Sequence, residues 1–414
     1  MEEKKSGAKL LSLLFTAIYF ASYVTRINFA AIVQELVSET GFEKSLLSIV
    51  LVCLSVTYGV GQIINGRIGD KIKPQNLILI GLCVATAVNL LFPLAAASVP
   101  FMCVLWAING FAQAMMWPPM VKIMVSTMTE AEYGAAVVQV SAGSSIGTIA
   151  VYLSAPLIIS LIGWQAVFYV SAIVGFLITA LWFFMKDRVS KAPEKEIRED
   201  TEEKAAPTEE KEEKPAFPKA AIFPIVFIAL AIIFQGMLRD GVSSWMPSYL
   251  AEVFGMENEA SILLTVSLSV FSVIAFYLSG FIYKKCFKNE VTCGAVIFGV
   301  ATIAAALMFL SLFFDLGPIL SVIFMMLITG CMHGVNLMLI THVPKRFKKY
   351  GNISTISGAI NSCTYIGSAI FTYGVAVLAE TLGWHVTVGI WAIIALLGTL
   401  SATVAIKRWR SFID

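Results

Sequence analysis

Long apolar segments, each about the length of a transmembrane helix, follow one another along the whole chain. A helix needs about 20 residues to cross a hydrocarbon core of about 30 Å. Short polar stretches separate the segments, and the apolar runs are too long to be the strands of a membrane barrel. We therefore expect twelve transmembrane helices, at residues 10–36, 45–66, 76–97, 99–125, 134–159, 164–185, 220–250, 260–283, 291–314, 318–342, 352–379 and 384–406.

Residues 186–219 interrupt this pattern with a polar stretch. It is dense in Lys and Glu, contains several prolines and has few apolar residues. Such a composition is typical of a solvated linker that builds no packed core. We therefore predict an N-terminal six-helix half at 1–185, a charged cytoplasmic linker at 186–219 and a C-terminal six-helix half at 220–414.

The two expected halves carry matching local sequences. Gly163-Trp164 stands at the start of the sixth expected helix, and Gly383-Trp384 stands at the start of the twelfth. Duplicated halves joined by a linker resemble the architecture of major facilitator transporters, in which the substrate site lies near the middle of the membrane between the halves. The expected fold class is therefore an all-α integral membrane protein with two pseudo-symmetric six-helix halves.

Composition and charge agree with a membrane protein. Hydrophobic residues make up 58% of the chain and charged residues only 14%, whereas about 25% of the residues in soluble domains are charged. The net charge is only +2, but Lys and Arg gather at the two termini and in the loops on one side, while Glu and Asp dominate the other side. This asymmetry predicts a multi-pass protein of the plasma (inner) membrane with both termini in the cytoplasm.

Two arginines lie deep inside expected transmembrane helices, at matching places in the two halves. Arg26 and Arg239 each come roughly 16 to 19 residues after the start of an apolar run, which is about 24–29 Å of helix. A charge at that depth is costly and normally faces a protein interior or an aqueous cavity. Two permanent cations that face one cavity favour a small anionic substrate.

The loop after the second expected helix carries a recognisable motif. Gly66, Asp70 and Lys71 match the major facilitator loop pattern Gly-x-x-x-Asp-Arg/Lys. The glycine permits close contact between helices, and the charged side chains can form a breakable latch on the cytoplasmic side. We expect these three residues to form a gating loop.

A narrower resemblance covers most of the chain. Residues 23–30, Tyr-Val-Thr-Arg-Ile-Asn-Phe-Ala, resemble the first-helix signature of the organophosphate:phosphate antiporter family. Gly110, Gln113 and the Trp-Pro-Pro run at 117–119 resemble its fourth-helix pattern, and residues 239–250 are similar to its seventh-helix pattern. That family includes glycerol-3-phosphate, hexose-phosphate and glucose-6-phosphate transporters.

The resemblance implies that Arg26 and Arg239 hold the phosphate of the substrate or inorganic phosphate during rocker-switch alternating access. A guanidinium offers a planar, permanently charged fork to phosphate oxygens, which supports this role. Two positions depart from the family pattern. Gln62, four residues after Tyr58, replaces the usual Lys, and Ser144 stands near the place of a His in the glycerol-phosphate members. The pocket then lacks one cation and one titratable ring, which favours a monoanion, a phosphonate or a substrate with its own positive group.

Further candidates lie on the helices that line the cavity in that architecture. Each of their side chains can instead make an interhelical hydrogen bond. His333 can act as a proton relay or as a hydrogen-bonded structural residue. These substrate-binding candidates are Tyr23, Asn28, Gln113, Trp117, Asp240, His333, Asn336, Asn361 and Tyr365, beside the arginines, Tyr58, Gln62 and Ser144.

Three functions fit these observations. The leading one is transport of a small phosphorylated or related organic anion in exchange for inorganic phosphate. The second is proton-coupled transport of a carboxylate or related anion, with Asp240 or His333 as the proton site. The third is a membrane sensor of sugar phosphate that binds its ligand without transport.

Several other classes are not supported. The sequence has no phosphate-binding glycine loop, no nucleophile with a base at useful spacing and no cluster with metal-ligand spacing. Basic residues are not interleaved with aromatic residues on a soluble face. We therefore expect no enzymatic activity, no cofactor, no metal and no nucleic-acid partner. The expected partners are the lipid bilayer, the anionic substrate and inorganic phosphate, and the expected functional unit is a monomer.

Overall fold

The computed structural model describes residues 2–42, 44–202, 217–256, 258–287 and 289–413. Helices separated by short loops account for nearly all of them. The helices are α1 Glu2–Thr40, α2 Lys44–Lys71, α3 Pro74–Leu91, η1 Phe92–Ala95, α4 Val99–Gln113, α5 Trp117–Thr127, α6 Glu130–Ile162, α7 Trp164–Glu202, η2 Lys219–Ala221, α8 Ile222–Phe254, α9 Asn258–Cys286, α10 Glu290–Phe313, α11 Pro318–Asn336, the π-helical η3 Leu337–His342, α12 Val343–Lys345, η4 Lys348–Tyr350 and α13 Ile353–Ile413.

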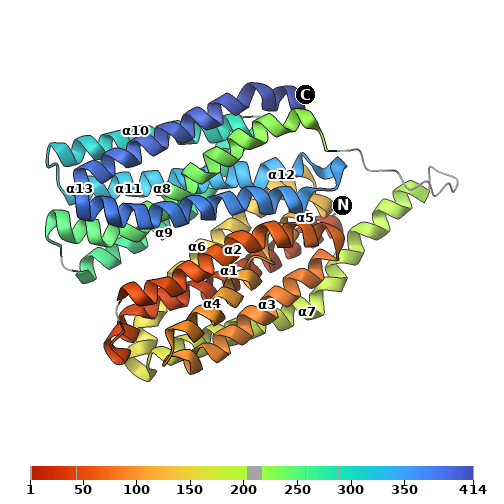
Figure 1. Cartoon of the computed structure of the whole chain (residues 1–414). Helices are drawn as coiled ribbons and strands as arrows, with labels where there is room; N and C mark the ends of the chain where they lie inside the picture. The colour runs from red at the N-terminus through yellow and green to blue at the C-terminus, as the bar shows by residue number, and fades with distance from the viewer. Residues whose placement is uncertain (1, 43, 203–216, 257, 288, 414) are drawn as a thin grey trace.

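The helices form two bundles that lie side by side (Figure 1). One bundle contains α1 to α7 and the other contains α8 to α13. Eleven helices in the described residues are long and apolar enough to cross a membrane. α13 consists of two helices joined at Gly383, whose φ of 79° interrupts the helix. The first part of α13 supplies the remaining expected span, so the predicted all-α fold with twelve transmembrane helices is confirmed.

Two expected segments differ in detail from the helices that form. The expected helix 99–125 is divided into α4 and α5, because Pro118 and Pro119 occupy the first turn of α5 and offer no backbone N–H to a continuous helix. α7 continues to Glu202, beyond the expected end of the sixth helix. Residues 203–216 of the expected linker lie outside the described part of the chain, so the domain boundaries at 185 and 219 remain a prediction.

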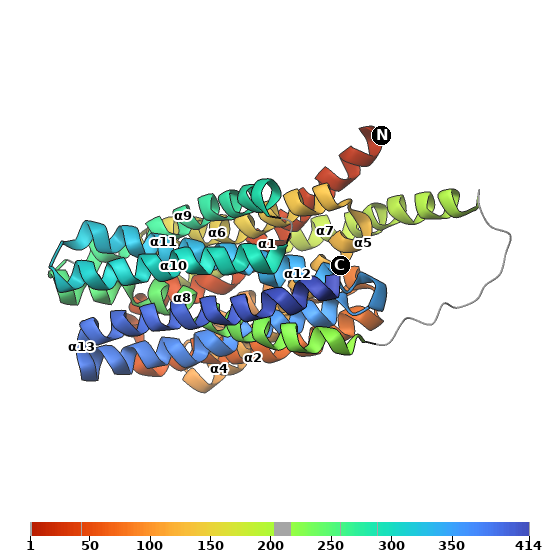
Figure 2. The same ribbon diagram turned by 90° about the horizontal axis from the view of Figure 1, so that it is seen from above.

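Both chain termini lie at the same end of the molecule in both views (Figures 1 and 2). We call this the termini end. α2 packs against α13 and α6 packs against α9, and these contacts join the two bundles. A Cβ atom on Gly358 of α13 would lie 2.1 Å from the carbonyl oxygen of Gln62 on α2. Only a glycine permits so close an approach of the two helices.

The opposite end shows the duplication of the halves in three dimensions. Gly163 and Gly383, with φ of 110° and 79°, each end one helix directly before a tryptophan. The indole of Trp164 donates a hydrogen bond to Glu39 at the end of α1. In the second half the indole of Trp384 donates to Glu252 near the end of α8, at 2.8 Å. Equivalent bonds therefore fix the first and last helices of each half.

Candidate substrate site

Arg26 on α1 lies among tyrosine side chains from both halves. Its guanidinium carbon is 4.2 Å from the ring centroid of Tyr23 and 5.0 Å from that of Tyr58 on α2. Its Nη1 donates a hydrogen bond of 3.4 Å to the hydroxyl of Tyr365 on α13. The arginine is only 9% exposed. Within the described residues no carboxylate forms an ion pair with it, so its charge is stabilised by two aromatic faces and one tyrosine hydroxyl.

Arg239 on α8 has a different environment. Its Nε and Nη2 donate to the two carboxylate oxygens of Asp240 at 2.7 and 2.9 Å. Neighbouring residues on a helix point about 100° apart, but the long arginine side chain folds back to reach the acid. Ser368 of α13 and His333 of α11 also face Asp240. An anion that binds Arg239 therefore has to compete with a carboxylate that is already in place.

The surroundings of the two arginines overlap. Tyr23 and Tyr365 each lie within electrostatic range of both guanidinium groups. Tyr23 comes from the first half and Tyr365 from the second, and the rings of Tyr365 and Tyr58 are 4.3 Å apart. The site therefore lies between the halves, with a cation supplied by each.

Tyr19 is a member of this cluster that the sequence analysis did not select. Its ring centroid is 5.3 Å from that of Tyr23 and 4.9 Å from that of Trp117 on α5. Tyr19, Tyr23 and Arg26 are spaced four and three residues apart, which places them on one face of a helix. That spacing could have identified Tyr19 from the sequence. Through it, Trp117 joins the site from the side of α5.

Asn28 and Gln113 lie in a buried hydrogen-bond network within the first half. Asn28 donates to the side chain of Asn89 at 2.6 Å, and Asn89 donates to the carbonyl of Thr25 at 2.8 Å. Gln113 donates to the hydroxyl of Thr25 at 2.9 Å and accepts a bond from Ser22. Asn28 and Gln113 therefore make interhelical hydrogen bonds, which the sequence analysis gave as the alternative to substrate binding.

Four other candidates are buried or half-buried, and no ion pair that involves them is found in the described part of the chain. Gln62 is fully buried, and neither atom of its amide group has a hydrogen-bond partner. Ser144 is also buried, and its hydroxyl donates to the carbonyl of Ser141 at 2.6 Å. Asn361 is buried on α13, and Asn336 is half-buried at the end of α11. Gln62 follows Tyr58 by one helical turn toward the termini end, so its unpaired amide lies between Tyr58 and the gating loop along α2.

The expected gating loop connects the two halves at the termini end. Asp70 accepts hydrogen bonds from the backbone N–H groups of Ser354 at 3.1 Å and Thr355 at 2.8 Å, in the first turn of α13. The hydroxyl of Thr355 donates to the same carboxylate at 2.7 Å. A carboxylate at a helix N-terminus satisfies free N–H groups and interacts favourably with the helix dipole. Lys122 on α5 lies 3.7 Å from this carboxylate.

Further contacts between the halves gather at the same end. The hydroxyl of Tyr133 on α6 donates to the carbonyl of Thr341 in η3, and Lys345 forms an exposed ion pair with Glu130 at 3.4 Å. Together with the close approach of α2 and α13, these bonds hold the two halves against each other at the termini end.

Comparison with known proteins gives matches over most of the chain. The sequence model of the Major Facilitator Superfamily matches residues 14–372. A glycerol-3-phosphate transporter of Bacillus subtilis (strain 168) is 29% identical over 309 residues, which cover 70% of this chain and 68% of that protein. A probable hexose phosphate transport protein of Chlamydia muridarum is 25% identical over 403 residues, which cover 90% and 85%.

A solved structure shares the fold. The major facilitator transporter FucP in its outward conformation superposes with a TM-score of 0.73 at 13% identity, covering 96% of this chain and 99% of that one. The sequence relatives confirm the resemblance that the first, fourth and seventh helices indicate.

Proposed function

Because the chain belongs to the Major Facilitator Superfamily, we propose that it is a secondary active transporter of a small phosphorylated anion, exchanged for inorganic phosphate. One observation carries the proposal. Arg26 is a buried cation without a described carboxylate partner, and it shares its tyrosines with a second arginine from the other half. Similar proteins named as glycerol-3-phosphate and hexose phosphate transporters support the choice of a phosphate group.

The geometry suggests how the anion is bound. A phosphate that enters between the halves first meets the guanidinium of Arg26, whose fork can hold two of its oxygens. Other oxygens of the same phosphate then replace the carboxylate of Asp240 on Arg239. One anion held by both halves draws them together, which is the step that alternating access requires.

The contacts between the halves at the termini end bear on the side of the membrane from which the substrate reaches the two arginines. The contacts at Asp70, Tyr133 and Gly358 close the path from the termini end, so the structure corresponds to a carrier closed on that side. We place the termini end in the cytoplasm and the protein in the plasma membrane, because the basic loops lie on that side. On this reading it is not an enzyme, and a monomer in the bilayer suffices for transport.

The buried amide of Gln62 narrows the substrate class. The site contains two arginines but no third cation at this position. A phosphate monoanion, a phosphonate or a phosphate ester with its own positive group then balances the site better than a densely charged sugar phosphate.

Exchange in vesicles tests the proposal. Purified protein is reconstituted into vesicles preloaded with inorganic phosphate, and uptake of labelled phosphate or glycerol 3-phosphate is measured without a pH gradient. Exchange is expected in the wild type and not in Arg26→Ala. Flux that appears only with a pH gradient contradicts antiport, and binding without flux identifies a sensor.

Proton coupling is the second candidate, and the ion pair at Asp240 favours it. Asp240 pairs with Arg239 and lies within electrostatic range of His333. Protonation of Asp240 would release Arg239 for an anion, so a proton and the anion would bind together. Uptake that rises with an imposed inward proton gradient, and loses this response in Asp240→Asn, distinguishes this mechanism from phosphate exchange.

A further inference from the structure

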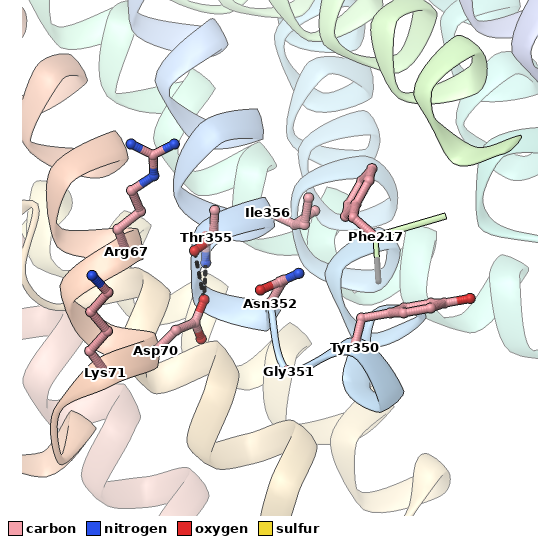
Figure 3. Close-up of a pocket in the computed structure, with 9 residues that line it drawn as sticks. All are labelled: Arg67, Asp70, Lys71, Phe217, Tyr350, Gly351, Asn352, Thr355 and Ile356. Atoms are coloured by element: carbon pink, nitrogen blue, oxygen red, sulfur yellow. Dashed lines mark hydrogen bonds between the residues drawn. The ribbon is translucent and has the colours of Figure 1, made fainter. Parts of the chain in front are cut away.

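A cavity lies at the termini end, and neither Arg26 nor Arg239 lines it. Its volume is about 540 Å³, and residues of both halves line it (Figure 3). α2 contributes Arg67, Asp70 and Lys71 to one side. Phe217, ahead of α8, and Tyr350, in η4, contribute aromatic rings to the other side. We call this space the gate cavity.

The lining of the gate cavity carries unpaired positive charge. Arg67 and Lys71 are exposed, and neither has an ion-pair partner among the residues that the structure describes. The carboxylate of Asp70 is directed at the start of α13, where it accepts three hydrogen bonds from Ser354 and Thr355, so it forms no direct ion pair with either cation. Two cations thus lie beside a space large enough for a small organic molecule.

We propose that the gate cavity binds a phosphate-bearing anion and that this ligand holds the termini end closed. A phosphate group carries nearly two negative charges near neutral pH, which match the two cations better than a single carboxylate does. Arg67 supplies a planar fork for its oxygens. The rings of Phe217 and Tyr350 and the side chain of Ile356 provide an apolar wall for the organic part of the ligand.

The effect on the gate follows from linkage. The cavity is complete only when α2 lies against the start of α13, because its walls come from both halves. A ligand that contacts both walls binds the closed arrangement in preference to the open one and shifts the population toward it. The site therefore acts as a regulatory site for transport and is distinct from the site that carries the substrate.

The test uses the full chain with the Arg26→Gln substitution, so that the result does not depend on the transport site. Two further variants are compared in this background: Arg67→Gln, and Lys73→Gln as a control. Lys73 is an exposed cation on the same loop that does not line the cavity. The measurements are the thermal unfolding midpoint and the hydrogen exchange of amides 353–358, with increasing glycerol 3-phosphate in detergent without anionic lipid.

We expect the ligand to raise the midpoint and slow the exchange in the background and in Lys73→Gln. In Arg67→Gln, the glycerol 3-phosphate concentration that gives half of this effect is expected to rise by about tenfold or more, because the guanidinium fork at position 67 is lost. Equal responses of Arg67→Gln and Lys73→Gln would overturn the assignment of the site.

A second comparison identifies the source of the phosphate. The same variants are placed in vesicles of phosphatidylcholine alone or with phosphatidic acid, whose headgroup is a phosphate monoester. Slower exchange of 353–358 with phosphatidic acid, but not with soluble glycerol 3-phosphate, assigns the site to a lipid headgroup, and the reverse assigns it to a soluble ester. No protection by either ligand contradicts the proposal.

A further variant tests whether ligand binding in the gate cavity requires the contact between α2 and α13. Gly358→Leu introduces a side chain where even a Cβ would lie 2.1 Å from the carbonyl oxygen of Gln62, so it should hold α2 and α13 apart. The effect of glycerol 3-phosphate should then be lost although Arg67 is intact. Gly374→Leu is the control, because Gly374 is a less crowded glycine of α13, where a Cβ would lie 3.6 Å from its nearest neighbour. A full ligand effect in Gly358→Leu would show that binding does not depend on the gate.

Discussion

Arg26 and Tyr365 form a hydrogen bond that joins the first half of the protein to the second. The bond, at 3.4 Å, is longer than the 2.7–3.2 Å usual for N–H···O bonds, and it is therefore weak. An arriving anion can replace this contact at little cost. If the proposed anion binds at Arg26, this pair is where we expect substrate binding to act on the contact between the halves.

Arg26→Lys is expected to abolish most exchange while the protein stays folded. Lysine keeps the positive charge but loses the two-pronged fork and the planar contact with Tyr23 and Tyr58. Exchange flux in phosphate-loaded vesicles and the elution profile of the purified protein are the two measurements. Normal affinity and flux in the lysine variant would contradict the role of the fork. Poor expression of both Arg26→Lys and Arg26→Ala would instead indicate a charge needed for folding.

Asp240→Asn is expected to tighten phosphate binding and to slow turnover. Asp240 occupies the Nε and Nη2 donors of Arg239, and a hydrogen bond to a charged group contributes about 1.5–3 kcal/mol. Removing the negative charge of this competitor should raise phosphate affinity on the order of tenfold, and release should slow accordingly. Affinity is measured by competition at fixed pH and salt. A weaker affinity would mean that the acid orients Arg239 for the anion and does not compete with it.

Gln62→Lys is expected to make stability depend more strongly on phosphate. The side chain is fully buried between α2 and α13, where an unpaired ammonium costs several kcal/mol. An anion nearby would offset part of that cost. The unfolding midpoint without phosphate should fall, and its rise with saturating phosphate should exceed that of the wild type. Equal phosphate-dependent shifts in both proteins would show that position 62 does not face the anion.

Asp70→Asn is expected to loosen the gate at the termini end. The substitution removes the charge from the hydrogen bonds to Ser354 and Thr355 and its interaction with the α13 dipole. Hydrogen exchange of amides 353–358 should become faster. Asp187→Asn is the matched control, because Asp187 is a largely exposed acid on α7 that forms an ion pair with its neighbour Lys186. Unchanged exchange in Asp70→Asn would show that the other contacts suffice for closure.

The sequence by itself determined the transmembrane helices and the two buried cations. A helix that crosses a bilayer satisfies its backbone hydrogen bonds within its own segment, so runs of about 20 apolar residues suffice to identify it. Arg26 and Arg239 stand out for the same local reason, since a charge inside such a run is rare. The glycines at 163 and 383 likewise mark helix ends through a local requirement for positive φ.

Only the tertiary structure decided how the two cations differ. Arg26 lies between tyrosines of α2 and α13, whereas Arg239 is held by Asp240, and the periodicity of α8 alone did not require this pair. The same holds for the polar candidates: Asn28 and Gln113 are bonded within the first half, while Gln62 is buried without a partner. These outcomes depend on side chains that are distant in the sequence. Packing between helices brings them together, and no local pattern specifies which of them meet.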